Sequence, residues 1–117
     1  MTQEALALAA KAGLDAGTLL EVLESSSSAI YLGMARLTLA CEFDDAFFTL
    51  ALAEKDVSLA LQSAADLKVE MGVTSAAHAL YRRALEAGLG DKVFFATLKV
   101  VEEAAGTRVP RLAPRKA

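Results

Sequence analysis

Hydrophobic residues recur every three or four positions along most of the chain, which is the spacing typical of amphipathic α-helices. This pattern predicts six helices, at about residues 2–12, 16–24, 29–40, 47–67, 74–87 and 92–105. No segment shows the alternation of apolar and polar residues that is typical of a β-strand. We therefore expect an all-α fold, a bundle of about six helices.

The predicted helix ends follow from the residues between the apolar segments. Gly13 closes the first helix, because glycine readily adopts the left-handed conformation found there. Asp15 and Asp91 are expected to cap the second and sixth helices, and one of the serines at 25–28 the third. The fifth helix is expected to start at Thr74 or Ser75. We expect one helical domain at 1–105, followed by a disordered basic tail at 106–117 that holds both prolines.

The first helix is apolar on most of its faces. Met1 leads almost directly into the sequence EALALAA, and both Leu6 and Leu8 lie among alanines. A helix that is apolar all round needs cover on all sides. We therefore expect the chain to be a fragment of a longer protein, or to pack against a second subunit as a homodimer.

The helix at 47–67 carries three consecutive charges, Glu54, Lys55 and Asp56, and none has an ionic partner three or four positions away. One face forms a predicted core stripe, made of Leu50, Ala53, Val57, Ala60, Leu61 and Ala64. The face with Lys55 also holds Phe48, Leu59, Gln62 and Asp66. Two interpretations remain open from the pattern: Lys55 lines a cleft and meets an anion, or its side chain extends past apolar neighbours to water.

Composition and charge exclude several classes of protein. The chain has 117 residues, 55% of them hydrophobic, and a net charge of −3, so no general attraction to nucleic acids or membrane surfaces follows. Three charges near the middle of residues 46–65 would each cost about 2.5–3.5 kcal/mol in a bilayer, so we expect a buried helix instead. The single cysteine, Cys41, cannot form an intrachain disulfide, and no basic leader is visible. These features fit the cytoplasm.

Few residues carry recognisable chemistry. Cys41 and His78 would form a nucleophile and base if the fold joined them, but no third orienting residue is evident, and a free cysteine most often fills a core. One histidine and one cysteine cannot build a zinc site, so no metal is expected. The GLG sequence at 88–90 lacks the strand and spacing of a dinucleotide-binding loop. The four serines fit a helix cap better than a phosphate site.

Three segments together resemble one family. FFTLALAEKDVSLAL, EALALAAKAGLDAGTLLEVLESSS and ALYRRALEAGLGDKVFFATLKVVEE are similar in order and spacing to the C-terminal helical domain of the β-hydroxyacid dehydrogenases. This family includes 3-hydroxyisobutyrate dehydrogenases, tartronate-semialdehyde reductases and glyoxylate/succinic semialdehyde reductases. The resemblance covers residues 3–104. Three positions depart from the family pattern, Ser58, Val93 and Phe95, where the family has glycine, aspartate and serine.

The resemblance implies a two-part enzyme, of which this chain is the second part. The family's Rossmann domain, its catalytic lysine and its substrate-binding SGG segment would lie upstream of Met1, so no catalytic residue is expected in this chain. Lys55 matches the lysine that reaches the cofactor near the nicotinamide. Asp56 matches the aspartate that helps to order the site, and Phe48 matches a phenylalanine close to the substrate.

The favoured function is therefore the C-terminal, site-closing and dimerisation domain of an NAD(P)-dependent dehydrogenase, which transfers a hydride between nicotinamide and a small 3-hydroxy acid or semialdehyde. We expect NAD or NADP in the complete enzyme, no cofactor on this chain alone, and no activity of the isolated chain. The alternative is a non-enzymatic helical module, derived from that family, that dimerises or binds a partner. The genomic sequence upstream of Met1 discriminates the two.

Overall fold

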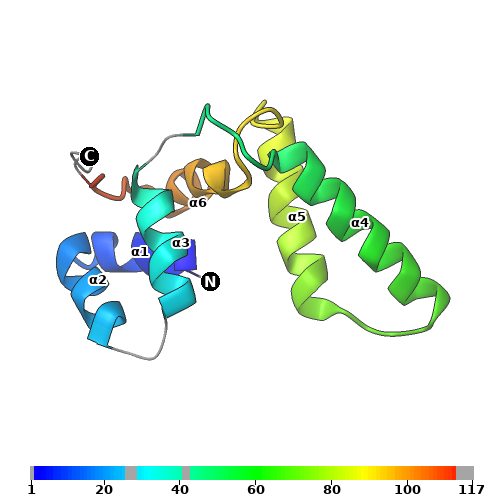
Figure 1. Ribbon diagram of the computed structural model, residues 1–117, viewed down its shortest axis with the longest axis horizontal. Coiled ribbons are helices and arrows are strands. Elements are labelled where there is room, and N and C mark those ends of the chain that lie inside the picture. Colours follow the sequence, from blue (N-terminus) through cyan, green and yellow to red (C-terminus); the bar gives the residue numbers. More distant parts are fainter. Residues whose placement is uncertain (1, 26–28, 41–42, 113–117) are drawn as a thin grey trace. The chain divides into compact units, whose positions relative to one another are not determined.

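The computed structural model describes residues 2–25, 29–40 and 43–112, and its described part consists of six α-helices, one short 3₁₀-helix and no strand beyond an isolated β-bridge (Figure 1). The chain divides into two compact units. The first comprises residues 1–42 and 101–117, and the second residues 43–100. The all-α prediction with six helices is confirmed. The expectation of one helical domain at 1–105 stays a prediction.

The first unit contains three helices, α1 (Thr2–Lys11), α2 (Ala16–Ser25) and α3 (Ala29–Ala40), which contact one another. Gly13 has φ +79° and ends α1, and the Asp15 carboxylate accepts a hydrogen bond from the Thr18 amide at 2.9 Å, so both predicted helix ends are confirmed. The Lys11 ammonium donates to the carbonyl of Ala105 at 2.7 Å. The predicted serine cap falls on residues 26–28, outside the described residues, or on Ser25, which is the last residue of α2.

The core of the first unit contains Leu6, whose exposed fraction is 1%, with Leu20 and Leu39. Leu6 was expected to need cover from a missing part of a longer protein or from a second subunit. That expectation is wrong for Leu6, because the chain itself buries this side chain. The side chain of Leu8 lies outside the described ones.

The C-terminal segment folds back instead of starting a disordered tail at residue 106. Val109 is 1% exposed, and its amide donates to the Glu102 carboxylate at 2.7 Å. The Arg111 guanidinium donates to both oxygens of the same carboxylate, at 2.6 and 2.9 Å, and the Leu112 amide donates to the Leu39 carbonyl. An apolar anchor and a paired carboxylate therefore order this segment as far as Leu112. Residues 113–117 lie outside the described part.

The second unit is built on two long helices joined by a short connection, α4 (Leu50–Asp66) and α5 (Gly72–Glu86), which lie side by side (Figure 1). Leu50, Ala84, Leu89 and Val100 form its core, packed against Leu80, Tyr81 and Leu85. Lys68 adopts φ +56° after α4, and Gly88 adopts φ +78° after α5. The helix α5 starts at Gly72, two residues before the predicted start.

The last helix is shorter than the predicted helix at 92–105. Residues Phe94–Thr97 form the 3₁₀-helix η1, and α6 spans Leu98–Ala105, so the boundary between the units falls within α6. Asp91 does not cap a helix: its carboxylate lies 3.4 Å from the Lys92 ammonium. The reason is that the carbonyls of Gly90 and Lys92 accept hydrogen bonds from α4, which holds this stretch of backbone outside a helix. Among the described residues no helix is long and apolar enough to cross a membrane.

Candidate functional site

Lys55 and Asp56 lie on the outer side of α4, where their side chains are 58% and 55% exposed. The Lys55 ammonium lies 3.1 Å from the Asp56 carboxylate. The expectation that neither charge has an ionic partner on its helix is therefore wrong, because the long lysine side chain bends along the helix surface to its immediate neighbour. An exposed pair of this kind contributes at most about 1 kcal/mol. Lys55 therefore remains available to an anionic ligand.

The opposite side of α4 faces the core of the second unit. Leu50, Ala53 and Ala64 are buried there, whereas Leu59 is 53% exposed on the side of Lys55. Ala60, which was predicted to belong to the core stripe, is exposed because it lies at the edge of that stripe. The pattern thus predicted correctly which side of α4 faces away from the core.

Phe48 precedes α4 instead of lying on it, because Thr49 is the N-cap and its hydroxyl accepts a hydrogen bond from the Leu52 amide. The predicted helix start at residue 47 is therefore too early. Phe48 is half-buried, its carbonyl accepts from the Phe94 amide at 3.0 Å, and its ring centroid lies 5.9 Å from that of Phe94. Lys55 lies seven positions after Phe48, on the helix that Phe48 precedes.

All five phenylalanines of the chain form one aromatic cluster, made of Phe43, Phe47, Phe48, Phe94 and Phe95. Their ring centroids lie 5.4–6.3 Å apart, in tilted or edge-to-face arrangements. Phe47 is 71% exposed, whereas Phe43 and Phe95 are 5% exposed. The cluster fixes the loop that carries Phe48 and presents one aromatic ring to solvent.

The amino-terminal end of α4 is already occupied by the protein's own backbone. The Leu50 amide donates to the Lys92 carbonyl at 2.8 Å, and the Ala51 amide to the Gly90 carbonyl at 3.1 Å. Free amides at a helix start would offer an anion site, but these two are satisfied. The hydrogen bond from the Lys92 ammonium holds the pKa of Asp44 below its usual value and ties the preceding loop to the same segment. Lys55 is therefore the better candidate for contact with an anion.

Glu54 has a different environment from the two charges that follow it. Its carboxylate lies 2.8 Å from His78 Nε2 and 4.0 Å from the Arg82 guanidinium, both on α5. The side chains of Glu54 and His78 are 16% and 25% exposed. Sequence reasoning missed this contact, although His78 and Arg82 are four positions apart and so share one face of α5. Cys41 lies outside the described residues, so the Cys41–His78 pair stays a prediction.

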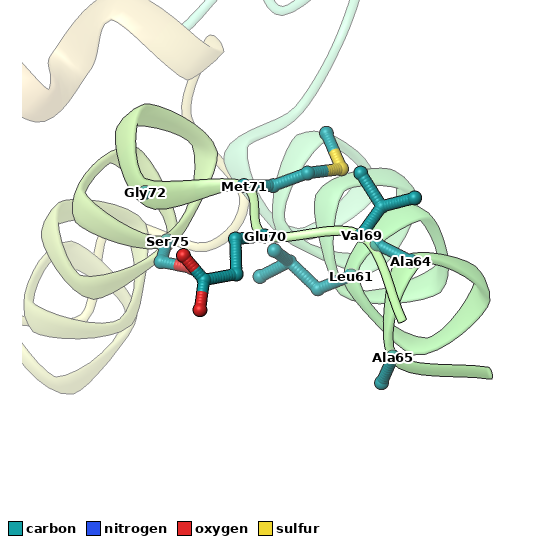
Figure 2. A pocket seen from close by; sticks show the side chains of 8 residues that line it. All are labelled: Leu61, Ala64, Ala65, Val69, Glu70, Met71, Gly72 and Ser75. Atoms are coloured by element: carbon teal, nitrogen blue, oxygen red, sulfur yellow. The ribbon is translucent and has the colours of Figure 1, made fainter. Parts of the chain in front are cut away.

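A shallow hollow of about 470 Å³ lies at the connection between α4 and α5, lined by Leu61, Ala64, Ala65, Val69, Glu70, Met71, Gly72 and Ser75 (Figure 2). Its lining is mostly apolar, and Glu70 and Ser75 supply the polar side chains. Neither Lys55 nor Phe48 lines it, since Phe48 precedes the other end of α4. In the part of the chain that the structure describes, no three His, Cys, Asp or Glu side chains are placed to hold a metal ion.

Comparison with known proteins identifies the family of this chain. A family model described as "NAD-binding of NADP-dependent 3-hydroxyisobutyrate dehydrogenase" matches residues 1–101. Glyoxylate/succinic semialdehyde reductase 1 of Arabidopsis thaliana is 33% identical over 101 residues, which are 85% of this chain and 35% of the reductase. A crystal structure of 3-hydroxyisobutyrate dehydrogenase from Salmonella typhimurium matches the fold with a TM-score of 0.75 at 22% identity, over 85% of this chain and 35% of that one.

The chain thus spans about a third of the length of these two relatives. The match to the family model covers almost the same residues as the motifs that suggested it, and the likeness of fold agrees with the all-helical architecture. The chain therefore belongs to the family of C-terminal helical domains of the 3-hydroxyisobutyrate dehydrogenase-like oxidoreductases.

Proposed function

We propose that this chain is the C-terminal domain of an NAD(P)-dependent β-hydroxyacid dehydrogenase, in which it closes the cofactor and substrate site and contributes to a homodimer. Such an enzyme transfers a hydride between nicotinamide and a small 3-hydroxy acid or semialdehyde, and we place it in the cytoplasm. The observation that carries this proposal is the family match over residues 1–101. The Arabidopsis relative, named for glyoxylate and succinic semialdehyde, supports small aldehydes as the substrate class.

Lys55 is the proposed cofactor contact, with Phe48 and Asp56 lining the site. The exposure of Lys55 and its weak adjacent pairing support this role, because a cation at the surface of a helix reaches an anionic ligand without leaving a buried partner unpaired. Phe48 is held by its backbone and its ring contact with Phe94. A ring held in this way offers a fixed apolar wall to a small substrate.

The chemistry of hydride transfer belongs to the nicotinamide, while the protein orients the reactants and moves the proton. The proton donor is expected on the nucleotide-binding part of the enzyme, so no residue of this chain is assigned a catalytic role. The cofactor is NAD or NADP in the complete enzyme, and the isolated chain is expected to bind neither.

A chimaeric enzyme tests this function. The matching third of the Arabidopsis reductase is replaced by this chain, and the oxidation of NADH and NADPH is followed with glyoxylate or succinic semialdehyde. We expect the chimaera to recover turnover that the reductase lacks without its helical third. A chimaera that is folded by circular dichroism but shows no turnover with either dinucleotide contradicts the proposal and favours a non-enzymatic helical module.

A further inference from the structure

The segment at residues 106–112 folds back on α6, and we name it the C-terminal latch. Gly106 adopts φ +60° directly after α6, a left-handed conformation that reverses the direction of the chain. The family match ends at residue 101, so the latch lies beyond the part of this chain that the family model describes. The dehydrogenase function proposed above assigns it no role.

One carboxylate holds the middle of the latch. Glu102 on α6 is 9% exposed, and it accepts a hydrogen bond from the Val109 amide at 2.7 Å. It also accepts hydrogen bonds from two nitrogens of the Arg111 guanidinium, at 2.6 and 2.9 Å. The same guanidinium donates to the Val109 carbonyl at 2.7 Å. Three donors of the latch therefore share a single charged acceptor, and hydrogen bonds to a charged group are the stronger kind.

The far end of the latch contacts a different helix. The Leu112 amide donates to the carbonyl of Leu39 on α3 at 3.2 Å. Val109, which is 1% exposed, lies three positions before Leu112. Because the contacts with α6 and α3 lie on adjacent stretches of one short segment, the contact with Glu102 also fixes the place of Leu112. Loss of the first contact should therefore weaken the second.

The helices of the first unit have contacts of their own. Each of α1, α2 and α3 contacts the other two, and Leu6 and Leu20 are buried among them. Terminal segments with few contacts open at a lower free energy than the core of a protein. The seven residues of the latch can therefore leave their place while these helices stay folded.

We propose that the C-terminal latch is a conformational device that opens and closes as one segment, is held closed by Glu102, and controls access to the C-terminal end of the chain. In the closed form Val109 is buried and Arg111 is paired. In the open form both residues reach solvent, and the peptide bonds after Arg108 and Arg111 become accessible to trypsin-like peptidases. The two forms differ mainly in one charged pair, so removal of either charge favours the open form.

Native-state hydrogen exchange of the purified chain, followed by NMR at neutral pH, tests whether the latch opens as one segment. We expect the amides of Val109 and Leu112 to have protection factors equal within about twofold, because a single opening exposes both. Both factors should be lower than that of the Ala35 amide. Ala35 is 0% exposed in the middle of α3, so its amide reports the unfolding of the first unit itself.

Glu102→Gln removes the charged acceptor. It should lower the protection factor of the Leu112 amide about tenfold or more, although that amide does not bind Glu102, and Val109 should lose as much. Arg111→Lys keeps the positive charge but loses the planar, two-pronged contact, so it should cause a smaller loss of the same kind. Glu103→Gln, at the exposed neighbouring position, is the matched control and should leave both protection factors unchanged.

Limited proteolysis with trypsin measures access to the C-terminal end. Cleavage after Arg108 and Arg111 should be about tenfold or more faster in Glu102→Gln than in the wild-type chain. Cleavage after Lys68, which is exposed in the connection between α4 and α5, should keep its rate and serves as the internal reference. Circular dichroism verifies that each variant is folded.

Three outcomes would overturn the proposal. An unchanged protection factor of Leu112 in Glu102→Gln would mean that the two ends of the latch open separately. Val109 and Leu112 amides that exchange as slowly as the Ala35 amide would mean that the segment opens only when the first unit unfolds. Cleavage after Lys68 that accelerates as much as cleavage in the latch would mean that the variant unfolds as a whole.

Discussion

At the scale of single residues, the three consecutive charges of α4 have different surroundings because successive helix positions turn by about 100°. Glu54 points to His78 and Arg82 on α5, whereas Lys55 and Asp56 point to solvent. The sequence indicated that Lys55 is unusual, since it shares a side of the helix with Leu59. It did not predict the partner of Glu54, because that contact depends on the register between two helices.

Lys55→Ala, made in a complete enzyme that carries this domain, should raise the Michaelis constant for the cofactor or lower turnover about tenfold. One charge-assisted contact contributes about 1.5 kcal/mol, which corresponds to that factor. The free energy of unfolding should change by less than about 0.5 kcal/mol, because the side chain is exposed. Steady-state kinetics and thermal unfolding measure the two effects, with Arg83→Ala on α5 as an exposed cationic control. A sharp fall in melting temperature with unchanged kinetics would show that the lysine acts through packing.

Glu102→Gln should lower the free energy of unfolding by about 1–3 kcal/mol at pH 7, because it removes a charged, largely buried hydrogen-bond acceptor. Burial alone would raise the pKa of Glu102, but hydrogen bonds from Arg111 and the Val109 amide outweigh it and hold the pKa below its usual 4.5.

A lowered pKa in the folded protein contributes stability that is fully present above about pH 4.5 and is lost as the pH falls through the folded-state pKa. The difference in the free energy of unfolding between the wild-type chain and Glu102→Gln, measured by urea titration, should therefore become smaller below about pH 4.5. Glu103→Gln, at the exposed neighbouring position, is the control and should show little difference at either pH. A difference that stays constant from pH 7 to pH 3 would mean that the charge of Glu102 is unimportant.

At the scale of elements, the ends of the helices depend on backbone contacts that hydrophobic periodicity does not contain. The pattern located all six helices, and Gly13 and Asp15 marked two ends correctly. The predicted starts of α4 and of α6 are both too early, and they have one cause. The Leu50 and Ala51 amides donate to the carbonyls of residues 92 and 90, which holds both stretches of backbone outside a helix. Such a contact joins positions about 40 residues apart in sequence and leaves no local signal.

Gly88→Ala should lower the free energy of unfolding by about 1 kcal/mol, since φ is +78° there and a side chain is strained in that conformation. Gly72→Ala is the matched control within the same unit. Gly72 lies at the start of α5 without a positive φ, and an added Cβ meets no atom within 4 Å. That variant should be neutral or stabilising by up to about 1 kcal/mol. Chemical denaturation compares the two, and equal effects would contradict the assigned role of Gly88.

At the scale of the whole molecule, the chain is a domain with two units that spans about a third of its relatives. Its family and fold were predictable, because the motifs keep their order and spacing. The prediction of a disordered tail is wrong for residues 106–112. Val109 and Arg111 bind the Glu102 carboxylate of α6, and these contacts depend on the folded helix and not on the local sequence. The roles of Phe48, Lys55 and Asp56 stay predictions.

The purified 117-residue chain should show no turnover of any hydroxy acid or semialdehyde with NAD, NADP or their reduced forms. Hydride transfer needs a bound nicotinamide and a proton donor beside the substrate, and both are expected on the nucleotide-binding part. Absorbance at the nicotinamide band, followed for hours at high protein concentration, measures this. Turnover above the rate of a heat-denatured sample would show that this chain carries a catalytic group of its own.

The contact between Glu102 and Arg111 also constrains the order in which these two positions can change during evolution. Loss of Arg111 first would leave a largely buried carboxylate with only the Val109 amide to bind it, which is the costly intermediate. Loss of Glu102 first would leave an arginine whose long side chain can turn to solvent. Descendants that lack both residues should therefore have passed through the replacement of Glu102, and reconstructed intermediates of that order should be the more stable ones.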